Sequence, residues 1–328
     1  MISSSDIRKD NKKRIYKLML TGGVFTKHRI AAVSGLSVAT CNTLLNDMAE
    51  AGLLLPAEEK ELRGIGRGSV RYQVNGGHES YLAVRFPGVQ GKIHAEFVVL
   101  SALGEEREVL QIEEVCLQTI LTGIEELLQR YPEISCIALA IPGIIVEDEI
   151  VSCEIPRLEK VGMKAAIEKR TALPVILDTD LHFMGCGAYV KGDDLVRTLG
   201  FFPEHLLPGL VTMHRDQLIT GGHGSAGLIG FLPIDTDGGA EQSLADYMVS
   251  GKCLPVIKQI IGAAAAFLDP DEILLSGKLI TEEVMAELAY YCERKISKLC
   301  RPRLIRIDDF SPYLMRGIFW KIVEEKKF

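Results

Sequence analysis

Residues 26–55 read TKHRIAAVSGLSVATCNTLLNDMAEAGLLL and decide the fold of the N-terminal part of the chain. Ile30, Ala31 and Val33 form the apolar face of a short helix, and Gly35 interrupts it. Ser37 then offers a side-chain oxygen that can cap the first N–H groups of a new helix. The stretch therefore predicts two helices joined by a tight turn, which is the pattern of a helix-turn-helix.

The second helix is predicted to be amphipathic, because its apolar positions recur at steps of three and four: Val38, Cys41, Leu44, Leu45 and Met48. Its other side carries short, uncharged polar side chains, which can approach base edges without repelling phosphate. Four residues are predicted to face the bases of double-stranded DNA or the adjoining backbone: Ser37, Thr40, Asn42 and Thr43.

The flanking segments complete a winged helix-turn-helix. Residues 11–20 predict a further helix with lysines on its surface, and residues 63–74, RGIGRGSVRYQV, combine the glycines of a turn with basic residues and an alternating strand. We expect six basic side chains to contact phosphates: Lys12, Lys13, Lys27, Arg29, Arg67 and Arg71.

The charge of the chain is uneven. Residues 1–72 contain 12 Lys and Arg against 7 Asp and Glu, a net charge of +5, whereas the remaining residues carry −12. This asymmetry is expected when one module binds a polyanion and the rest does not. Two alternatives stay open: a helical hairpin that only packs against the rest of the protein, and wing arginines that only solvate a hairpin.

Composition limits the class of protein. The chain has 328 residues, of which 47% are hydrophobic, and no uninterrupted apolar run of 18 or more. The N-terminus is polar and basic, so we expect neither a membrane span nor a signal peptide and a cytoplasmic location. Eight scattered cysteines include no CxxC pair and no Cys/His cluster at zinc spacing, so neither a metal nor disulfides are expected.

The glycine-rich segment 75–80, NGGHES, is predicted to be a hinge, dividing the chain into residues 1–75 and 76–328. Beyond it, strands predicted at 81–86, 94–100, 134–141, 175–177, 210–213 and 272–275 alternate with helices predicted at 113–129, 181–189 and 244–267. This alternation indicates an α/β architecture.

Three segments, LDTDLHFMGCGAY (177–189), GGHGSAGLIG (221–230) and FLDPDEILLSGKL (267–279), together with the Pro-Gly of residues 140–143, resemble motifs of the ROK family of bacterial repressors and sugar kinases. With a winged helix in front, the resemblance is to the regulator branch. It implies an actin-like (ribonuclease H-like), two-lobed kinase-type domain behind the DNA-binding module, and a homodimer or higher homo-oligomer.

The resemblance also shows which parts of the kinase chemistry have changed. Asp180 matches the general base of the family's kinases, but we expect it to serve as a helix N-cap instead, since a short acidic residue between a strand and a helix commonly has that role. Arg85 falls at or near an acidic position of the first phosphate loop, and the second phosphate loop is missing. Leu228 and Phe231 replace a glutamate and a histidine that contact sugar, and residues 236–251 lack the cysteines of the zinc segment. We therefore expect no catalysis, no cofactor and no metal.

The leading hypothesis is a DNA-binding transcriptional regulator, a repressor, whose degenerate kinase-like domain dimerises. The competing hypotheses are a residual ATP-dependent sugar kinase that uses Asp180, and an assembly protein whose helix-turn-helix contacts other proteins. A small-molecule effector stays open, with the candidate ligand-binding residues Asp178, Asp180, His182 and His223, and also His214.

Overall fold

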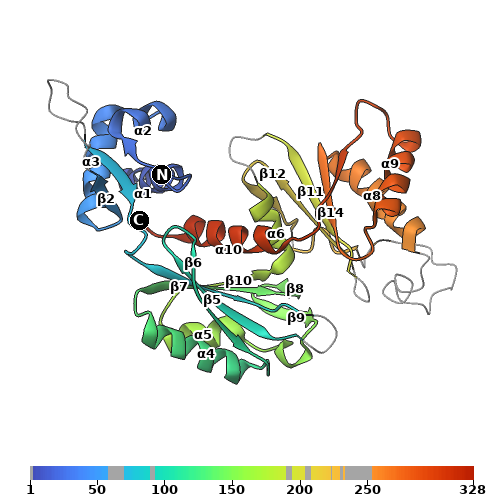
Figure 1. Ribbon diagram of the computed structural model, residues 1–328, viewed down its shortest axis with the longest axis horizontal. Coiled ribbons are helices and arrows are strands. Elements are labelled where there is room, and N and C mark those ends of the chain that lie inside the picture. The colour runs from blue at the N-terminus through green and yellow to red at the C-terminus, as the bar shows by residue number, and fades with distance from the viewer. Residues whose placement is uncertain are drawn as a thin grey trace.

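The computed structural model describes residues 3–57, 70–88, 93–189, 194–203, 208–222, 224–229, 232 and 253–328. Three groups of elements follow one another along the chain: an N-terminal helical module, a first α/β lobe and a second α/β lobe (Figure 1). In the described part of the chain, no helix is long and apolar enough to cross a membrane.

The N-terminal module contains the predicted helix-turn-helix. Three helices pack with a small antiparallel sheet in the order β1-β3-β2, and their bounds are α1 (Ser4–Met19), α2 (Lys27–Ser34), α3 (Val38–Glu50), β1 (Phe25–Thr26), β2 (Leu54–Ala57) and β3 (Arg71–Val74). Strands β2 and β3 pair from Leu54 opposite Val74 to Ala57 opposite Arg71. They form the base of the predicted wing, whose tip lies outside the described residues.

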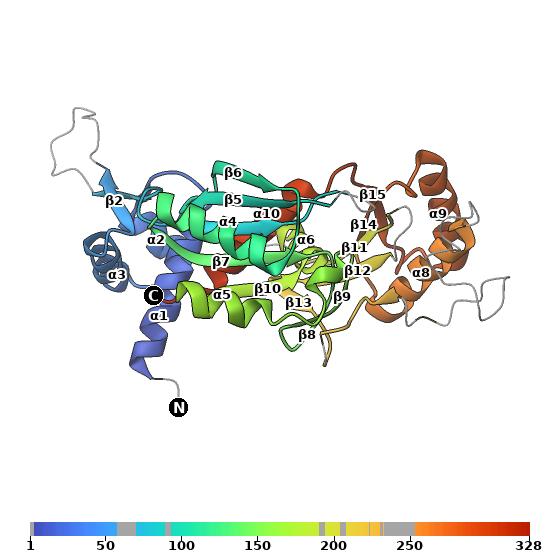
Figure 2. The same cartoon turned by 90° about the horizontal axis from the view of Figure 1, so that it is seen from below.

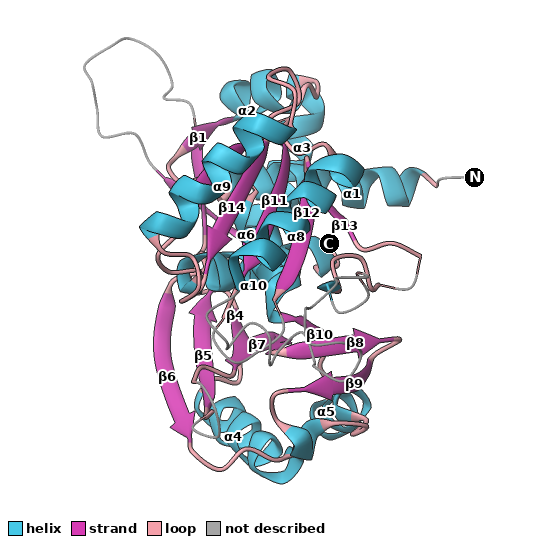
Figure 3. Cartoon of the chain, turned by 90° about the vertical axis from the view of Figure 1, so that its right-hand side faces the viewer, coloured by secondary structure: helices cyan, strands magenta, loops and turns pink. Residues whose placement is uncertain are grey.

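The first lobe is a five-stranded sheet in the order β10-β7-β4-β5-β6. Its strands are β4 (Ser80–Arg85), β5 (Ala95–Ser101), β6 (Glu106–Ile112), β7 (Ile134–Ile141) and β10 (Val175–Thr179). Helices α4 (Leu117–Arg130) and α5 (Met163–Thr171) cover one face (Figure 3). The hairpin of β8 (Gly143–Val146) and β9 (Glu149–Cys153), followed by the 3-10 turn Pro156–Leu158, connects β7 to α5.

The second lobe repeats this topology with the order β13-β12-β11-β14-β15. Its elements are β11 (Val196–Phe201), β12 (Gly209–His214), β13 (Gln217–Ile219), β14 (Glu272–Ser276), β15 (Arg303–Arg306), α8 (Cys253–Leu268) and α9 (Glu282–Lys295). In each lobe, three antiparallel strands are followed by two parallel strands. The first of these pairs with the first antiparallel strand, and the second pairs with the strand just added. This repetition is the actin-like, ribonuclease H-like arrangement that the resemblance implied.

Two helices connect the lobes. Helix α6 (Asp180–Ala188) leads from β10 into the second lobe, and α10 (Ser311–Glu325) leads back and runs towards α1 (Figure 1 and Figure 2). They cross at glycines, because a Cβ on Gly187 would overlap the carbonyl oxygen of Tyr313, and one on Gly317 would overlap that of Phe183. The two backbones are thus in direct contact, which no larger residue would permit.

One apolar core runs from the N-terminal module into the first lobe. It joins Ile15, Tyr16 and Met19 of α1 to Tyr81 and Val98 of the first sheet, and it continues into α10. The ring of Tyr16 meets that of Phe328 edge to face at 5.4 Å. The predicted hinge 75–80 therefore lies beside packed side chains, which differs from the expectation that few contacts cross it. The division of the chain at residue 75 stays a prediction.

We predict that Gly317→Ala lowers the free energy of unfolding by about 1–3 kcal/mol, because the new methyl group has to displace backbone atoms of α6. Chemical denaturation of the full chain measures this. Gly162→Ala is the matched control, since a Cβ there meets nothing within 4 Å. Equal stability of the two variants would contradict the close helix crossing.

Candidate DNA-binding surface and ligand cleft

The turn between α2 and α3 is formed by the residues that the sequence indicated. Gly35 adopts a left-handed conformation with φ 70°, which a residue with a side chain reaches only with strain, and so ends α2. Ser37 caps α3, and its Oγ accepts a hydrogen bond from the backbone N–H of Thr40 at 3.0 Å. Helix α3 therefore begins at a fixed position relative to α2.

Helix α3 buries one side and exposes the other. Cys41, Leu44, Leu45 and Met48 are at most 3% exposed, as their spacing predicted. Ala39, Thr43 and Asn46 lie exposed along the opposite side, at steps of three and four. Asn46 was not among the predicted contact residues. It accepts a hydrogen bond from Tyr72 Oη at 2.9 Å, which connects the exposed side of α3 to β3.

The remaining predicted base contacts are partly engaged within the module. The hydroxyls of Ser37 and Thr40 lie 2.8 Å apart, and half-buried Asn42 accepts a hydrogen bond from Lys27 Nζ at 3.3 Å. The hydroxyl of Thr43 donates to the carbonyl oxygen of Ala39 at 3.2 Å. These contacts orient the side chains on the exposed face of α3.

The predicted phosphate contacts fall into three groups. Lys27 and Arg29 lie on α2 next to α3, and the guanidinium of exposed Arg29 stacks over the ring of Phe25 at 4.9 Å. Lys12 lies 3.5 Å from Asp47, and Lys13 lies 3.4 Å from Glu324 of α10, so both already face carboxylates. Arg71 begins β3 at the base of the wing, and Arg67 lies outside the described residues.

A second group of polar residues gathers where β10 passes into α6. Thr179 caps α6 and accepts a hydrogen bond from the N–H of His182, and Asp180 follows as the first helical residue. The alternative role of Asp180 as the N-cap is therefore wrong, because the residue before it has the extended backbone and the capping bond. Asp178 Oδ1 and His182 Nδ1 lie 2.6 Å apart, so the structure brings these two predicted candidates together.

Glu154 completes this group, and sequence reasoning missed it. It follows β9, and its charge interacts with that of Asp180 across the start of α6. Burial, and secondly the charge of Asp180, raise the pKa of Glu154 to about 7. Burial also raises the pKa of Asp180 to about 6, although the N–H of Leu181 and the charge of His182 oppose the shift. We call Glu154, Asp178, Asp180 and His182 the acidic cluster.

The other candidates do not join the acidic cluster in the described structure. His214 ends β12 and is exposed. It lies towards the far end of α6, since Gly209 at the start of β12 faces Leu181, and Val211 faces Gly185. Leu228 bridges to Gly209. His223, Phe231 and the segment 236–251 lie outside the described residues. Within the described ranges, no group of three or more His, Cys, Asp or Glu is arranged to hold a metal ion.

Arg85 occupies the position where the resemblance expects an acidic residue. Its Nε donates a hydrogen bond to Glu96 at 2.7 Å, and Glu96 also contacts His94 and Gln111. Burial disfavours the charge on Glu96, but these three partners outweigh it and lower the pKa of this carboxyl. The strand end thus holds a closed ion pair, which leaves no free carboxylate of Glu96 for a metal.

A cavity of about 630 Å³ lies between β14, the start of α9 and the start of α10. Its charged lining consists of two cations, Lys278 and Arg306, and four carboxylates, Glu282, Glu283, Asp308 and Asp309. A nucleoside polyphosphate entering this cavity would meet net negative charge, which disfavours its binding.

The fold and these sites define a two-lobed, kinase-like protein with an N-terminal helix-turn-helix. The sequence model of the ROK family matches residues 90–254. The chain belongs to the ROK family.

Individual relatives agree with this assignment. The chain is 25% identical to the DNA-binding transcriptional repressor Mlc of Escherichia coli K12 over 95% of this chain and 75% of that protein. The crystal structure of a ROK family transcriptional regulator, a homologue of Mlc, aligns with 98% of this chain and 100% of its own, with a TM-score of 0.73 and 17% identity. Lmo2764 of Listeria monocytogenes, described as an N-acetylmannosamine kinase, aligns with 75% of this chain and 99% of its own, with a TM-score of 0.61 and 16% identity.

We predict that Glu154→Gln makes the protein more stable at high pH. The folded protein holds a proton on Glu154 up to about pH 7, whereas an ordinary glutamate releases it near 4.5. The folded state therefore binds more protons between these values, and stability falls as pH rises through this window. Glutamine has no proton to lose in this range, so its variant avoids the loss of stability that ionisation of Glu154 causes. The gain in Tm over the native protein should therefore grow from about pH 5 to about pH 8.

Glu149→Gln, which removes an exposed carboxylate from the same hairpin, is the control for this measurement. A difference in Tm that stays constant across the pH range for Glu154→Gln would show that Glu154 does not lie in a charge-disfavouring environment.

Proposed function

We propose that this protein is a DNA-binding transcriptional regulator that acts as a repressor. The observation that carries the proposal is the capped helix α3, which exposes short polar side chains over a buried apolar side and stands beside the basic residues of α2. A helix of this form fits the major groove. The relative Mlc is itself named a DNA-binding transcriptional repressor, which supports the same reading.

In this proposal the base contacts come from Asn42 and Thr43, with Asn46 added, while Ser37 and Thr40 fix the start of α3 and approach the backbone. Lys27, Arg29, Arg67 and Arg71 contact phosphates. Lys12 and Lys13 stay proposed phosphate contacts, but they have to exchange Asp47 and Glu324 for the DNA. We propose residues 1–75 as the DNA-binding domain. We also propose a cytoplasmic location, where the protein would reach its DNA partner.

The kinase-like part, residues 76–328, is proposed to be a non-catalytic scaffold. Asp180 lies at the position of a general base, yet the neighbouring features do not suit phosphoryl transfer from ATP. Arg85 is tied to Glu96, and the cavity beside α9 is lined mainly by carboxylates. Transfer of a phosphoryl group depends on cationic groups and a metal that neutralise the triphosphate. The acidic cluster is then our candidate for contacting a neutral or cationic effector.

We further propose a homodimer, since helix-turn-helix proteins commonly read two half-sites one helical turn apart through a two-fold axis. The number of subunits bound per DNA duplex tests the homodimer, and the titrations described below measure it.

Arg29→Ala and Asn42→Ala should weaken DNA binding in different ways. Arg29→Ala removes a phosphate contact, so affinity should fall for every sequence and the slope of log K against log salt should decrease by about 1. Asn42→Ala removes a base contact, so about 1–3 kcal/mol of discrimination should be lost at one base position. Titrations of a duplex selected from a random pool, at several salt concentrations, measure both effects.

Arg157→Ala, on the exposed surface of the first lobe, is the matched control for the loss of one arginine. The absence of salt-dependent, sequence-selective binding by the native protein would overturn the proposed function.

The protein should not phosphorylate sugars. Incubation of the full chain with Mg-ATP and a panel of hexoses should give no ADP above the rate without protein, because the cavity beside α9 in the described part of the chain has a net negative lining that disfavours the triphosphate. Hexose-dependent ADP formation that disappears in Asp180→Asn would identify a working kinase and refute the scaffold role.

A further inference from the structure

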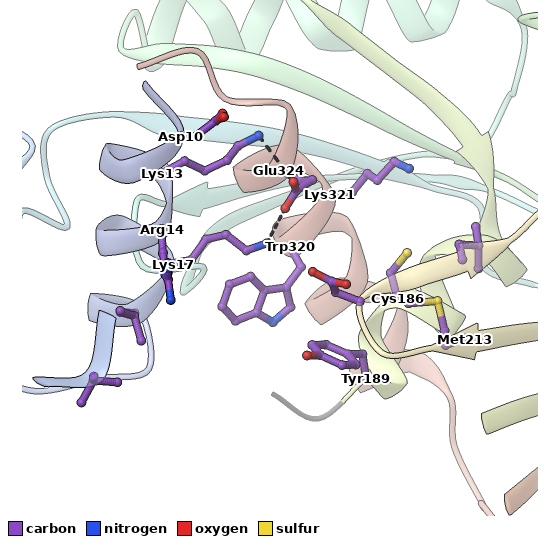
Figure 4. A pocket seen from close by; sticks show the side chains of 14 residues that line it. Asp10, Lys13, Arg14, Lys17, Cys186, Tyr189, Met213, Trp320, Lys321 and Glu324 are labelled. Atoms are coloured by element: carbon purple, nitrogen blue, oxygen red, sulfur yellow. Dashed lines mark hydrogen bonds and ion pairs between the residues drawn. The ribbon is translucent and has the colours of Figure 1, made fainter. Parts of the chain in front are cut away.

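A second cavity lies where the N-terminal module meets the connecting helices. It has a volume of about 640 Å³ and is lined by residues of α1, α2, the end of α6, the β12–β13 hairpin and α10 (Figure 4). This volume is in the range of small-molecule sites. The cavity is separate from the acidic cluster, which lies at the other end of α6. We call it the α1–α10 cavity.

Flat aromatic groups form part of its wall. The indole of Trp320 extends into the space between α1 and the end of α6, and the ring of Tyr189 lies on the opposite side (Figure 4). Both are partly exposed, and Met213 and Leu218 add apolar surface. Such surfaces stack against the apolar face of a ring compound, and a buried indole or phenol also offers a hydrogen-bond donor.

Cations line the side formed by α1. Arg14 and Lys17 are one turn apart on this helix, and Lys321 comes from α10. In the part of the chain that the structure describes, the side chains of Arg14 and Lys321 have no hydrogen-bond or ion-pair partner, and the same holds for the indole N–H of Trp320. Of the three lining carboxylates, Glu324 already binds Lys13 and Lys17, and Asp10 and Asp216 are exposed. The available groups within the cavity are therefore mainly donors.

We propose that the α1–α10 cavity binds a small ring compound that carries a phosphate, such as a sugar phosphate or a nucleoside monophosphate. The ring would pack between Trp320 and Tyr189, and the phosphate would accept hydrogen bonds from Arg14 and Lys17. Arginine and lysine side chains of this kind bind phosphate through charge-assisted hydrogen bonds.

Binding would also act on the DNA-binding module. Lys17 is held by Glu324 of α10, and a phosphate beside Arg14 competes with this carboxylate for the lysine. The ligand therefore changes the contact that fixes α1 to α10, and with it the DNA affinity. This regulatory consequence rests on the proposed function, whereas ligand binding does not.

The fluorescence of Trp320 tests the proposal, because it is the only tryptophan of the chain and it lines the cavity. The full-length protein is titrated with glucose 6-phosphate and with AMP, which distinguish the two sources of ring phosphate. Glucose and inorganic phosphate are the controls for each half of the ligand. We expect a saturable change with at least one ring phosphate at concentrations where neither control responds.

Three variants locate the response. Arg14→Gln should weaken binding about tenfold, as expected for the loss of one charge-assisted hydrogen bond. Asp216→Asn should tighten binding modestly, an effect that misfolding cannot imitate. Arg294→Gln, which changes an arginine on α9, should leave binding unchanged. Calorimetric titration of Trp320→Phe, where the optical signal is lost, should show weaker binding with the same preference for ring phosphates.

No saturable response to either ring phosphate, or an equal response to inorganic phosphate alone, would overturn the proposal. A response that Arg14→Gln does not weaken, or that Asp180→Asn abolishes, would also overturn it by placing the ligand elsewhere. DNA binding without ligand is measured separately: if it is absent while the Arg14-dependent response is present, the proposed function fails and the cavity assignment stands.

Discussion

The arrangement of the whole molecule depends on the direct backbone contact between α6 and α10. These two helices carry the chain from one lobe to the other and back, and Gly187 and Gly317 let them approach until peptide groups touch. The contact leaves little freedom for the helices to slide, since packed backbones have few alternative arrangements. Two of the groups of residues described above touch this pair: the acidic cluster lies at the start of α6, and the α1–α10 cavity lies between its end and α10.

The end of α10 also determines how the N-terminal module is held. Beyond the helix, Lys326 forms an ion pair with Glu79, a buried residue of the predicted hinge that also accepts hydrogen bonds from Tyr81 and Ser135. Glu324 binds Lys13 and Lys17 of α1. Polar contacts thus surround the apolar contact between Tyr16 and Phe328. A segment that reads as a flexible linker is held in place by residues almost 250 positions away in the sequence.

Local patterns explain which features could be predicted. The helix-turn-helix, β7 and β14 follow from short-range signals, namely the capping serine, Gly35 and uninterrupted apolar strands. Helix α10 was not predicted, although it has a regular apolar face. The importance of Gly317 arises only from what lies opposite it, and the sequence contains no sign of that neighbour. Glu154 was missed for the same reason: its altered pKa depends first on burial and secondly on the charge of Asp180, which lies on another element. The side-chain hydrogen bonds of Ser37, Thr40 and Asn42 could not be predicted from sequence patterns either, because they depend on side-chain orientation.

The contact of Tyr16 with Phe328 has a consequence for the synthesis of the protein. Helix α1 is synthesised before residues 311–328, so the ring of Tyr16 can meet that of Phe328 only after those residues have left the ribosome. Contacts between such distant segments form late and slowly in folding. The part of α1 that faces residues 311–328 therefore stays uncovered until those residues have been synthesised, whereas its contacts with α2 and α3 can form earlier.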